Sequence, residues 1–414
     1  MMRPVEEMQT AILDAMPLLE EIQVDFGDAI GAVLSRPVDA PEDLPGFDNA
    51  AVDGFAVVSA DVAEVPAELN VVDDVAAGCL PSVVVTRGNA SRIMTGAPVP
   101  TGADAIIPVE DVEMATHDRV RILEPGRIGD NIRPAGGNVR AGSRVFGVGL
   151  RVEARHASVM ASMGILPLVR RRPIVAIMST GDELVPPSTP VLDPGIVRDS
   201  NRTLIAGLLA ELGVEVIDFG IVPDDAEAFG SALDEAAGAA DVIVTSGGVS
   251  MGAYDVVKLT LRERGTVDFL RIAMQPGKPL GFGTVSGVPF FGLPGNPVSV
   301  FVSFEQFVRP ALLSMMGANR LFRDRVAAVL DDGVSTNPEK TVFVRVVTER
   351  DGAGLWHARR SGGQSSNVLS ALAFADALAV VPVGTDRVEP GGAVELEMMR
   401  WPEARTRKEA LDDR

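Results

Sequence analysis

The stretch Ile-Val-Ala-Ile-Met-Ser-Thr-Gly-Asp-Glu, residues 174–183, decides the fold class. An apolar run ends in a polar loop that contains glycine, and Asp-Val-Ile-Val-Thr-Ser-Gly-Gly at 241–248 repeats this pattern. Continuous apolarity is typical of central strands in a parallel sheet that is covered on both faces. The alternation of strands with helical patterns predicts an α/β layer domain over 173–318. We expect its helices at 201–212, 225–239, 255–264 and 297–316.

The segments on either side predict other structures. Residues 1–26 carry apolar side chains at helical spacing and predict one helix. From about 40 to 170, short apolar runs alternate with Gly, Pro and Asp, which favours a β-rich region. Beyond residue 320 strand patterns return and predict a β-domain, followed by a charged tail.

Composition excludes several function classes. The 414 residues carry a formal net charge of −20, which repels phosphate backbones and anionic membranes, so we expect neither nucleic acid nor a membrane as partner. Cys79 is the single cysteine, which excludes thiolate metal sites within one chain. The N-terminus does not resemble a signal peptide, and a cytoplasmic location is expected. With three histidines, none beside a nucleophile motif, the chemistry must depend on carboxylates, Lys, Arg, hydroxyls and backbone amides.

Two loops of the α/β region suit an anion. The first, Ser246-Gly247-Gly248-Val249-Ser250, leads into a predicted helix and offers amide and hydroxyl donors at the positive end of its dipole. An ordinary glycine-rich turn is the alternative. The second, Leu293-Pro294-Gly295-Asn296-Pro297-Val298-Ser299, places Asn296 as a helix N-cap and Pro297 at the first helical position. Capping alone would explain the Asn-Pro pair but not the whole string.

Acidic residues also follow the predicted strands. Asp182, Glu183, Asp224 and Asp255 would lie at one edge of the sheet, because ligands of open α/β sheets bind beyond the carboxyl ends of the strands. Each could be an N-cap, but several together favour a divalent cation with oxygen ligands, Mg²⁺ above all. On a nearby loop, Lys278 and the preceding Arg271 could neutralise a phosphate or an oxyanion.

Taken together, the motifs resemble the MoeA family, whose relatives include the E domain of gephyrin. The similarity runs from about residue 5 to 400. The matching strings are DNAAVDGFA (48–56), RIMTGA (92–97), GDNIR (129–133), STGDEL (179–184), TSGGVSMGAYD (245–255), PGKP (276–279) and LPGNPVS (293–299).

The resemblance implies a multidomain architecture and a homodimer. It predicts an elongated, discontinuous N-terminal domain, a β-rich second domain, a three-layer molybdopterin-binding α/β domain and a C-terminal β-barrel-like domain before the tail. Their limits would be 1–40 with 137–172, 41–136, 173–318, 319–402 and 403–414. In this family the site lies between the α/β domain of one subunit and the second domain of the other, so Asp53, Thr95 and Arg133 would lie opposite Ser246–Ser250.

The resemblance also implies a reaction. Family members convert adenylylated molybdopterin and molybdate to molybdenum cofactor and AMP, with a divalent cation. Ser246, Gly247, Gly248 and Ser250 would bind the substrate's phosphates with the loop that contains Pro294, Gly295, Asn296, Pro297 and Ser299. Glu183, Asp224 and Asp255 would hold Mg²⁺, and further substrate contacts are expected from Arg133, Asn138, Asp182 and Gln275. Arg271, Lys278 and Ser366 would face the oxyanion. The expected catalytic set consists of Asp53, Thr95, Glu183, Asp224, Asp255 and Lys278. A molybdopterin adenylyltransferase and apo-molybdoenzymes are expected as partners.

Two positions depart from the family pattern, and two rival functions stay open. Asn138 replaces an acidic group, and Gln275 replaces a lysine. The α/β module alone also resembles molybdopterin adenylyltransferases and CinA-like nucleotide hydrolases, although the strings at 48–56 and 92–97 argue against both. A non-catalytic binding scaffold is the second rival, and it would lack a metal-competent cleft.

Overall fold

The structure is a computed structural model that describes residues 2–248 and 255–401, without the side chains of Ala115, Asp255 and Val256. Contacts divide the chain into two compact units. The first contains Met1–Ser35, Val148–Ala154 and Pro167–Arg414, and the second contains Arg36–Gly147 and Arg155–Leu166. None of the described helices is long and apolar enough to cross a membrane.

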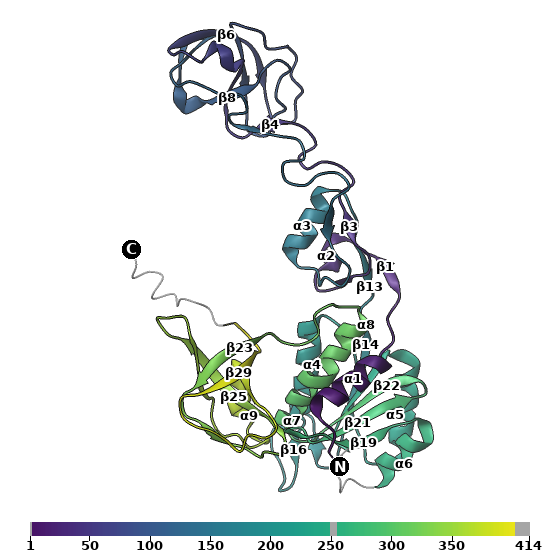
Figure 1. Ribbon diagram of the computed structural model, residues 1–414. Helices are drawn as coiled ribbons and strands as arrows, with labels where there is room; N and C mark the ends of the chain where they lie inside the picture. Colours follow the sequence, from purple (N-terminus) through teal and green to yellow (C-terminus); the bar gives the residue numbers. More distant parts are fainter. Residues whose placement is uncertain (1, 249–254, 402–414) are drawn as a thin grey trace. The chain divides into compact units, whose positions relative to one another are not determined.

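A six-stranded sheet forms the centre of the α/β domain in the first unit, where the apolar runs predicted it (Figure 1). Its order is β17-β14-β18-β22-β21-β19, in which the first four strands are parallel and the last two pair antiparallel. The strands are β14 (Ile174–Thr180), β17 (Glu215–Val222), β18 (Val242–Ser246), β19 (Asp268–Arg271), β21 (Pro279–Val285) and β22 (Val288–Leu293). Both quoted runs are therefore central strands, as predicted.

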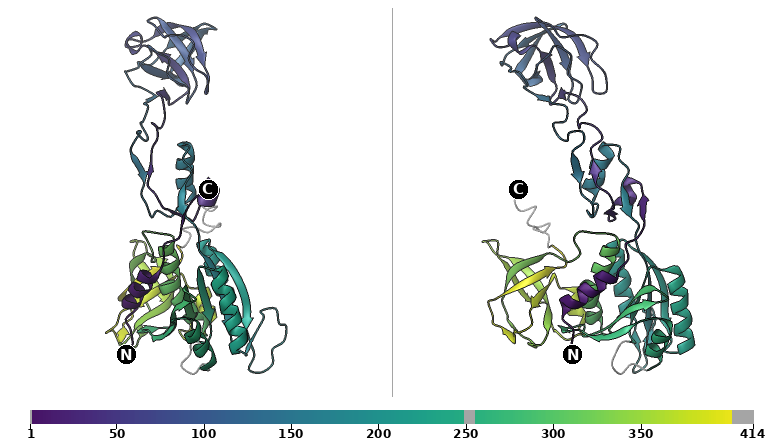
Figure 2. Two further views of the ribbon diagram at one scale, coloured as in Figure 1. Left: turned by 90° about the vertical axis from the view of Figure 1, so that its right-hand side faces the viewer. Right: turned by 45° about the vertical axis from the view of Figure 1, so that its right-hand side comes forward.

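Alternate residues of β14 enter two different cores, which makes the domain three-layered. Val175 and Ile177 pack in the core that contains helices α4 (Ser200–Leu212), α7 (Pro297–Ser303) and α8 (Arg309–Met315). Ala176 and Met178 pack in the core on the opposite face, with α5 (Ala226–Ala239) and α6 (Asp255–Arg264). Because successive side chains of a strand point to opposite faces, continuous apolarity is what a doubly covered sheet requires. The three-layer prediction is confirmed (Figure 2).

The long helix expected at 297–316 contains an interruption. A π-helical turn, η3 (Phe304–Val308), separates α7 from α8. It holds two polar residues in the core, Glu305 at 3% exposure and Gln306 at 2%. Gln306 donates a hydrogen bond of 2.7 Å to Glu397 of the C-terminal domain and accepts one of 3.1 Å from Gln9. Buried polar groups need such partners. Single π-helical turns inside α-helices are frequently found at functional sites.

The N-terminal helix is shorter than predicted. Helix α1 spans Val5–Ala15 rather than residues 1–26, and Met16 already has extended backbone angles. Pro17 is the reason, because a residue before proline is driven out of the helical region. The chain then forms β1 (Glu21–Gln23), which joins β13 (Leu168–Arg170) and β2 (Val33–Leu34) in a small sheet.

The C-terminal β-domain closes into a barrel, as predicted. The order β20-β25-β26-β23-β29-β27 is closed by an additional pairing of β25 with β27. The strands are β20 (Met274–Gln275), β23 (Arg325–Leu330), β25 (Thr341–Arg350), β26 (Trp356–Arg360), β27 (Ala377–Val381) and β29 (Gly392–Met398). Strand β20 comes from the α/β segment, so the 272–278 connection is shared by both domains. Helix α9 (Leu369–Ala373) and the pair β24 (Val334–Ser335) and β28 (Arg387–Val388) complete the domain.

The second unit is β-rich, as the short apolar runs predicted. Its main sheet has the order β8-β5-β7-β6-β10-β9, and Phe55, Leu69 and Val120 lie in its core. The strands are β5 (Gly54–Val57), β6 (Ala67–Val75), β7 (Asn89–Ile93), β8 (Ala105–Pro108), β9 (Val112–Thr116) and β10 (Arg119–Ile122). Two short ribbons pair β4 (Asn49–Ala50) with β11 (Ile132–Arg133) and β3 (Val38–Asp39) with β12 (Arg144–Phe146).

Candidate functional site

The predicted phosphate and acidic loops meet at one edge of the α/β sheet. Ser179 of β14 pairs with Ser246 of β18, and Ser246 pairs with Leu293 of β22, so three strands end in register. The antiparallel strands bring two further segments to the same edge, because Pro279 begins β21 and pairs with Arg271 at the end of β19. The carboxyl edge therefore collects the loops that follow three strands together with the cations Arg271 and Lys278.

Buried hydroxyl groups without partners lie at this edge. Ser179, Thr180 and Ser246 are at most 4% exposed, and each hydroxyl lacks a hydrogen-bond partner in the described part of the chain. A buried hydroxyl that makes no hydrogen bond costs free energy, so three of them together suit a polar ligand that restores their bonds. Sequence reasoning named Ser246 but did not place Ser179 and Thr180 in the site, although both end the strand that decides the fold.

Gly247 and Gly248 pass close to Thr180. Their φ angles are +91° and +70°, in the left-handed region that favours glycine. A Cβ atom on Gly247 would lie 2.3 Å from the carbonyl oxygen of Thr180, and one on Gly248 would lie 3.0 Å from its hydroxyl. The two glycines therefore let the backbone turn beside the buried hydroxyls. Ser250, which was predicted to bind with them, lies outside the described residues.

The Pro294–Pro297 loop is held from two sides. Asn201, at the start of α4, donates a hydrogen bond of 2.7 Å to the carbonyl of Gly295. Asn296 is the residue before α7, as predicted, but its side chain does not cap the helix. It donates instead to the hydroxyl of Ser366 at 3.0 Å, and the amide of Val298 donates to the carbonyl of Ser366 at 3.2 Å.

This contact brings the predicted oxyanion residue Ser366 to the predicted phosphate loop. Pro294 is buried, Pro297 is half-buried, and Ser299 is buried in the first turn of α7. The exposed members of the loop are Gly295 and Asn296. Asn201 was not predicted as a site residue, yet its Oδ1 atom is buried without a partner among the described residues.

Three of the four predicted carboxylates converge. The amide of Asp224 lies 3.4 Å from a carboxylate oxygen of Asp182. Burial raises the pKa of Asp224, and the negative charges of Asp182 and Glu183 raise it further. One carboxylate oxygen of Asp224 is buried and has no partner in the part of the chain that the structure describes. Carboxylates that repel one another in this way are suited to a cation.

The described residues fit a cation with few protein ligands. Among the side chains that the structure describes, no group of three His, Cys, Asp or Glu is arranged to hold a metal ion. The side chain of Asp255 lies outside this description, and its backbone begins α6. Mg²⁺ commonly uses one or two carboxylates and completes its shell with water and substrate phosphates. Asp182, Glu183 and Asp224 offer this kind of oxygen donor.

The two predicted cations lie on a segment that both domains of the first unit share. The amide of Ile272 donates to the carbonyl of Lys278 at 2.7 Å, which closes the 272–278 connection. Lys278, Arg271 and Gln275 are all exposed. A Cβ atom on Gly277 would lie 2.9 Å from the hydroxyl of Ser303 on α7, so the connection packs tightly against that helix.

Arg345 is a functional candidate that sequence reasoning missed. It lies on β25 with 0% exposure, and its Nη2 donates to the carbonyls of Gly363 at 2.7 Å and Ser365 at 3.2 Å. Its Nε and Nη1 atoms are buried without hydrogen-bond partners, and it forms no ion pair with a described carboxylate. Burial lowers the pKa of Arg345. A buried guanidinium without a counter-ion is costly, so this position suits an anion next to Ser366.

No local signal could have revealed Arg345. It occupies an interior position of the apolar strand TVFVRVV, where a lone arginine usually points to solvent. The loop that contacts Arg345, residues 363–366, contains the predicted site residue Ser366, but this loop reaches β25 only in the folded chain.

The second unit assembles the other predicted residues. The amide and the hydroxyl of Thr95 each donate to Asp53 at 2.7 Å. These two bonds hold the pKa of Asp53 below its usual value. Arg133 donates at 3.3 Å to the carbonyl of Ala51, two residues before Asp53. Asn138 is exposed, and its amide donates to the carbonyl of Leu44 at 3.0 Å.

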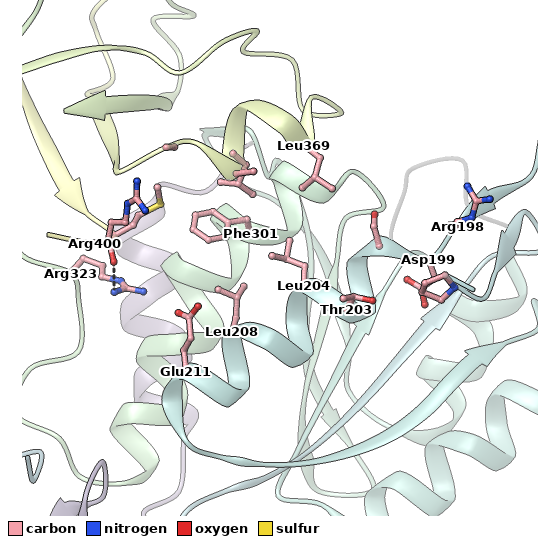
Figure 3. A pocket seen from close by; sticks show the side chains of 16 residues that line it. Arg198, Asp199, Thr203, Leu204, Leu208, Glu211, Phe301, Arg323, Leu369 and Arg400 are labelled. Carbon is pink, nitrogen blue, oxygen red and sulfur yellow. Dashed lines mark hydrogen bonds between the residues drawn. The ribbon is translucent and has the colours of Figure 1, made fainter. Parts of the chain in front are cut away.

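A large groove lies elsewhere in the first unit (Figure 3). It has a volume of about 710 Å³ and runs between α4, α7, α9 and residues 399–400. Leu204, Leu208 and Phe301 make it mostly apolar. It contains none of the predicted site residues, although its end at Asp199 lies beside Asn201. The polar strand edge, rather than this groove, is the place where the predicted residues meet.

Three family models match successive parts of the chain. A model described as the MoeA N-terminal region (domain I and II) matches residues 3–164. A probable molybdopterin binding domain matches residues 176–314, and the MoeA C-terminal region (domain IV) matches residues 327–398.

Relatives are similar over nearly their full length. A molybdopterin molybdenumtransferase 2 of Mycobacterium tuberculosis is 39% identical over 409 residues, which cover 96% of this chain and 99% of that protein. A molybdopterin molybdenumtransferase of Nostoc sp. is 35% identical and covers 94% and 92%. The crystal structure of a molybdopterin biosynthesis moeA protein from Pyrococcus horikoshii superposes with a TM-score of 0.80 at 28% identity, covering 96% of this chain and 100% of that one.

Proposed function

We propose, from the premise that this chain belongs to the MoeA family, that it inserts molybdenum into molybdopterin as a molybdopterin molybdenumtransferase. The substrates are adenylylated molybdopterin and molybdate, and the products are molybdenum cofactor and AMP. The observation that carries the proposal is the convergence of anion-binding, acidic and cationic groups at one edge of the α/β sheet. The match of the N-terminal region to residues 3–164 argues against the adenylyltransferase and hydrolase alternatives, in which only the α/β module is expected.

The phosphates of the substrate bind at the ends of β14, β18 and β22. The buried hydroxyls of Thr180 and Ser246 supply donors, and the hydrogen bond from Asn296 to Ser366 stiffens the neighbouring loop. Donors that are already oriented stabilise charge on a leaving phosphate without reorganising. No side-chain nucleophile is needed, which agrees with the scarcity of Cys and His.

The carboxylates of Asp182, Glu183 and Asp224 attract the divalent cation, and Asp255 would join them. When bound, Mg²⁺ would neutralise phosphate charge at this edge. The raised pKa of Asp224 supports the assignment, because a carboxylate under repulsion gains most from a cation.

Arg345, Ser366 and Lys278 bind the molybdate oxyanion. Arg345 supplies a buried positive charge with two unsatisfied nitrogens, and Ser366 supplies a hydroxyl whose position Asn296 fixes. Lys278 adds an exposed charge on the 272–278 connection. Because Gln275 contributes no charge there, the positive charge for the oxyanion comes from Arg345 and Lys278. Tungstate, a tetrahedral dianion of similar size, would bind in the same way.

The protein acts as a homodimer in the cytoplasm, and Asp53, Thr95 and Arg133 of a second copy complete each site. The tight hydrogen bonds of Asp53 to Thr95 support a preorganised carboxylate. Asn138 is neutral where the family pattern has an acidic group, so this chain carries one negative group fewer.

Turnover of the purified protein tests the proposal. Adenylylated molybdopterin, Mg²⁺ and molybdate are supplied, and both AMP release and reconstitution of an apo-molybdoenzyme are followed. We expect AMP release that requires the oxyanion and is lost in Glu183→Ala. Binding of the pterin nucleotide without cleavage, under molybdate or tungstate, would overturn the transferase assignment and favour a binding role.

A further inference from the structure

Four arginines line a pocket of about 270 Å³ away from the sheet edge. They come from three segments, Arg151, Arg309 on α8, and Arg320 with Arg323 in the connection to the barrel. Asp324 is the one acidic residue in the lining. The whole chain has a net charge of −20, so this concentration of positive charge opposes the general field of the protein.

One buried carboxylate near the pocket, that of Glu305, is paired mainly with Arg323. Glu305 is 3% exposed and accepts two hydrogen bonds from Arg323, at 2.8 and 3.0 Å. The Nε atom of Arg309 is 3.9 Å from Glu305, beyond hydrogen-bond distance, and its Nη1 donates to the carbonyl of Leu321. Glu305 therefore neutralises Arg323 well and Arg309 only partly.

Arg151 and Arg320 form no ion pair with an acidic residue that the structure describes, although the negative charge of Glu153 acts on Arg151. Arg151 donates to the carbonyls of Gly31 at 3.1 Å and Leu212 at 3.3 Å. Arg320 is exposed and makes neither a hydrogen bond nor an ion pair with the described part of the chain. Burial and the charges of Arg323 and Arg151 lower the pKa of Arg309 to about 10, although Glu305 and Glu211 oppose the shift. Positive charge in this pocket is thus incompletely balanced.

We propose that this pocket binds a phosphoryl group or a similar tetrahedral oxyanion through Arg151, Arg309 and Arg320. Guanidinium groups present forked donors that match two oxygens of such an anion, and charge-assisted bonds of this kind are strong. None of the strand-edge residues lines the pocket, so the proposal is independent of the transferase reaction. Phe322 and Trp401 lie exposed in the lining and would favour a phosphate ester with an aromatic ring over free phosphate.

Tryptophan fluorescence of the full chain tests the proposal. The chain has two tryptophans, Trp356 and Trp401, with ring centroids 5.9 Å apart, and Trp401 lines the pocket. Inorganic phosphate and AMP are titrated separately, with ionic strength held constant by sodium chloride. We expect a saturable change in emission. A lower half-saturating concentration for AMP would identify a nucleotide as the source of the phosphoryl group, and equal or lower values for phosphate would identify the free anion.

Three variants locate the binding. Arg320→Gln should raise the half-saturating concentration about tenfold, since one charge-assisted contact is lost. Arg359→Gln is the matched control, because Arg359 is also exposed and without an ion pair among the described residues, and it should change nothing. Lys278→Gln, at the sheet edge, should also leave the titration unchanged. The proposal is overturned if the wild-type signal does not saturate, if Arg320→Gln and Arg359→Gln behave alike, or if Lys278→Gln alone abolishes the response.

Discussion

The side-chain amide of Asn296 donates a hydrogen bond to the hydroxyl of Ser366 at 3.0 Å, across 70 positions of the sequence. The bond joins the loop before α7 to the loop whose carbonyl groups also accept hydrogen bonds from the buried guanidinium of Arg345. It therefore links the proposed phosphate-binding part of the site to the proposed oxyanion-binding part.

Ser366→Ala should raise the KM for molybdate while the fold persists. One hydrogen bond contributes about 0.5–1.5 kcal/mol, so we expect an increase of roughly 2- to 10-fold. Ser365→Ala is the matched control, because the Ser365 side chain makes no hydrogen bond in the described structure. Asn296→Ala should act like Ser366→Ala, and the double variant should be less than additive. If the effects of Ser366→Ala and Asn296→Ala on the KM for molybdate are fully additive in steady-state kinetics, the two residues act separately.

Arg345→Gln should abolish stabilisation by oxyanions. A ligand at 100 times its Kd stabilises a protein by about 2.7 kcal/mol when it binds only the folded state. We expect this gain from molybdate or tungstate, and Arg345 supplies the buried charge for their binding. Thermal unfolding with and without each oxyanion measures the effect, and Arg359→Gln should retain it. If Arg345→Gln is stabilised as much as the wild type, the arginine is structural.

Gly247→Ala should destabilise the protein and abolish turnover. The new Cβ would lie 2.3 Å from the carbonyl oxygen of Thr180, at a φ of +91°, which costs about 1–3 kcal/mol. Gly207→Ala, within α4, meets nothing within 4 Å and should stabilise by about 0.5–1 kcal/mol. Urea denaturation compares the two variants. Equal stability would mean that the loop can shift away from Thr180.

Asp224→Asn should stabilise the protein at neutral pH in the presence of EDTA. The folded-state pKa of Asp224 is raised above 3.8, so protonation favours folding, and this contribution is lost as the pH rises through the folded pKa. Below pH 3.8 the wild type and the variant should therefore converge. Mg²⁺ should stabilise the wild type at pH 7 but not Asp224→Asn.

Asp225→Asn is the control for this experiment. Asp225 caps α5 by accepting bonds from Glu227 and Ala228, and asparagine caps almost equally well. Thermal unfolding of the three proteins between pH 3 and 8 gives the comparison. A loss of stability in Asp224→Asn at pH 7 would contradict the role given to repulsion from Asp182 and Glu183.

Asp53→Ala and Glu183→Ala should each abolish the proposed molybdenum insertion and leave the protein folded. If two copies share each site, co-expression of the two variants should restore about a quarter of the wild-type turnover, because half of the dimers are mixed and each has one intact site. Mixed dimers without activity would show that each site is built within one chain. Unfolding of either variant would show that its carboxylate stabilises the fold.

The sequence by itself determined the α/β domain and the sheet edge at which the candidate site residues meet. The apolar runs at 174–180 and 242–246 predict buried parallel strands, and the loops that follow them must then share one edge. The prediction of these strands succeeded because the hydrophobic pattern and the turn residues act over a few positions. They can therefore be interpreted without knowing the rest of the chain. Local rules also have limits, because Pro17 ends α1 at Ala15 although apolar spacing continues.

Only the tertiary structure decided which polar groups lack partners. Asn296 has the position of an N-cap, yet its side-chain amide donates a hydrogen bond to Ser366, in the loop between β26 and α9. Arg345 looks like an ordinary strand residue, yet the fold buries it beside the carbonyls of Gly363 and Ser365 without supplying a counter-ion. The π turn at Phe304–Val308 likewise accompanies buried bonds to distant residues. Burial and pairing depend on contacts between segments far apart in the chain, and these form only when the chain folds.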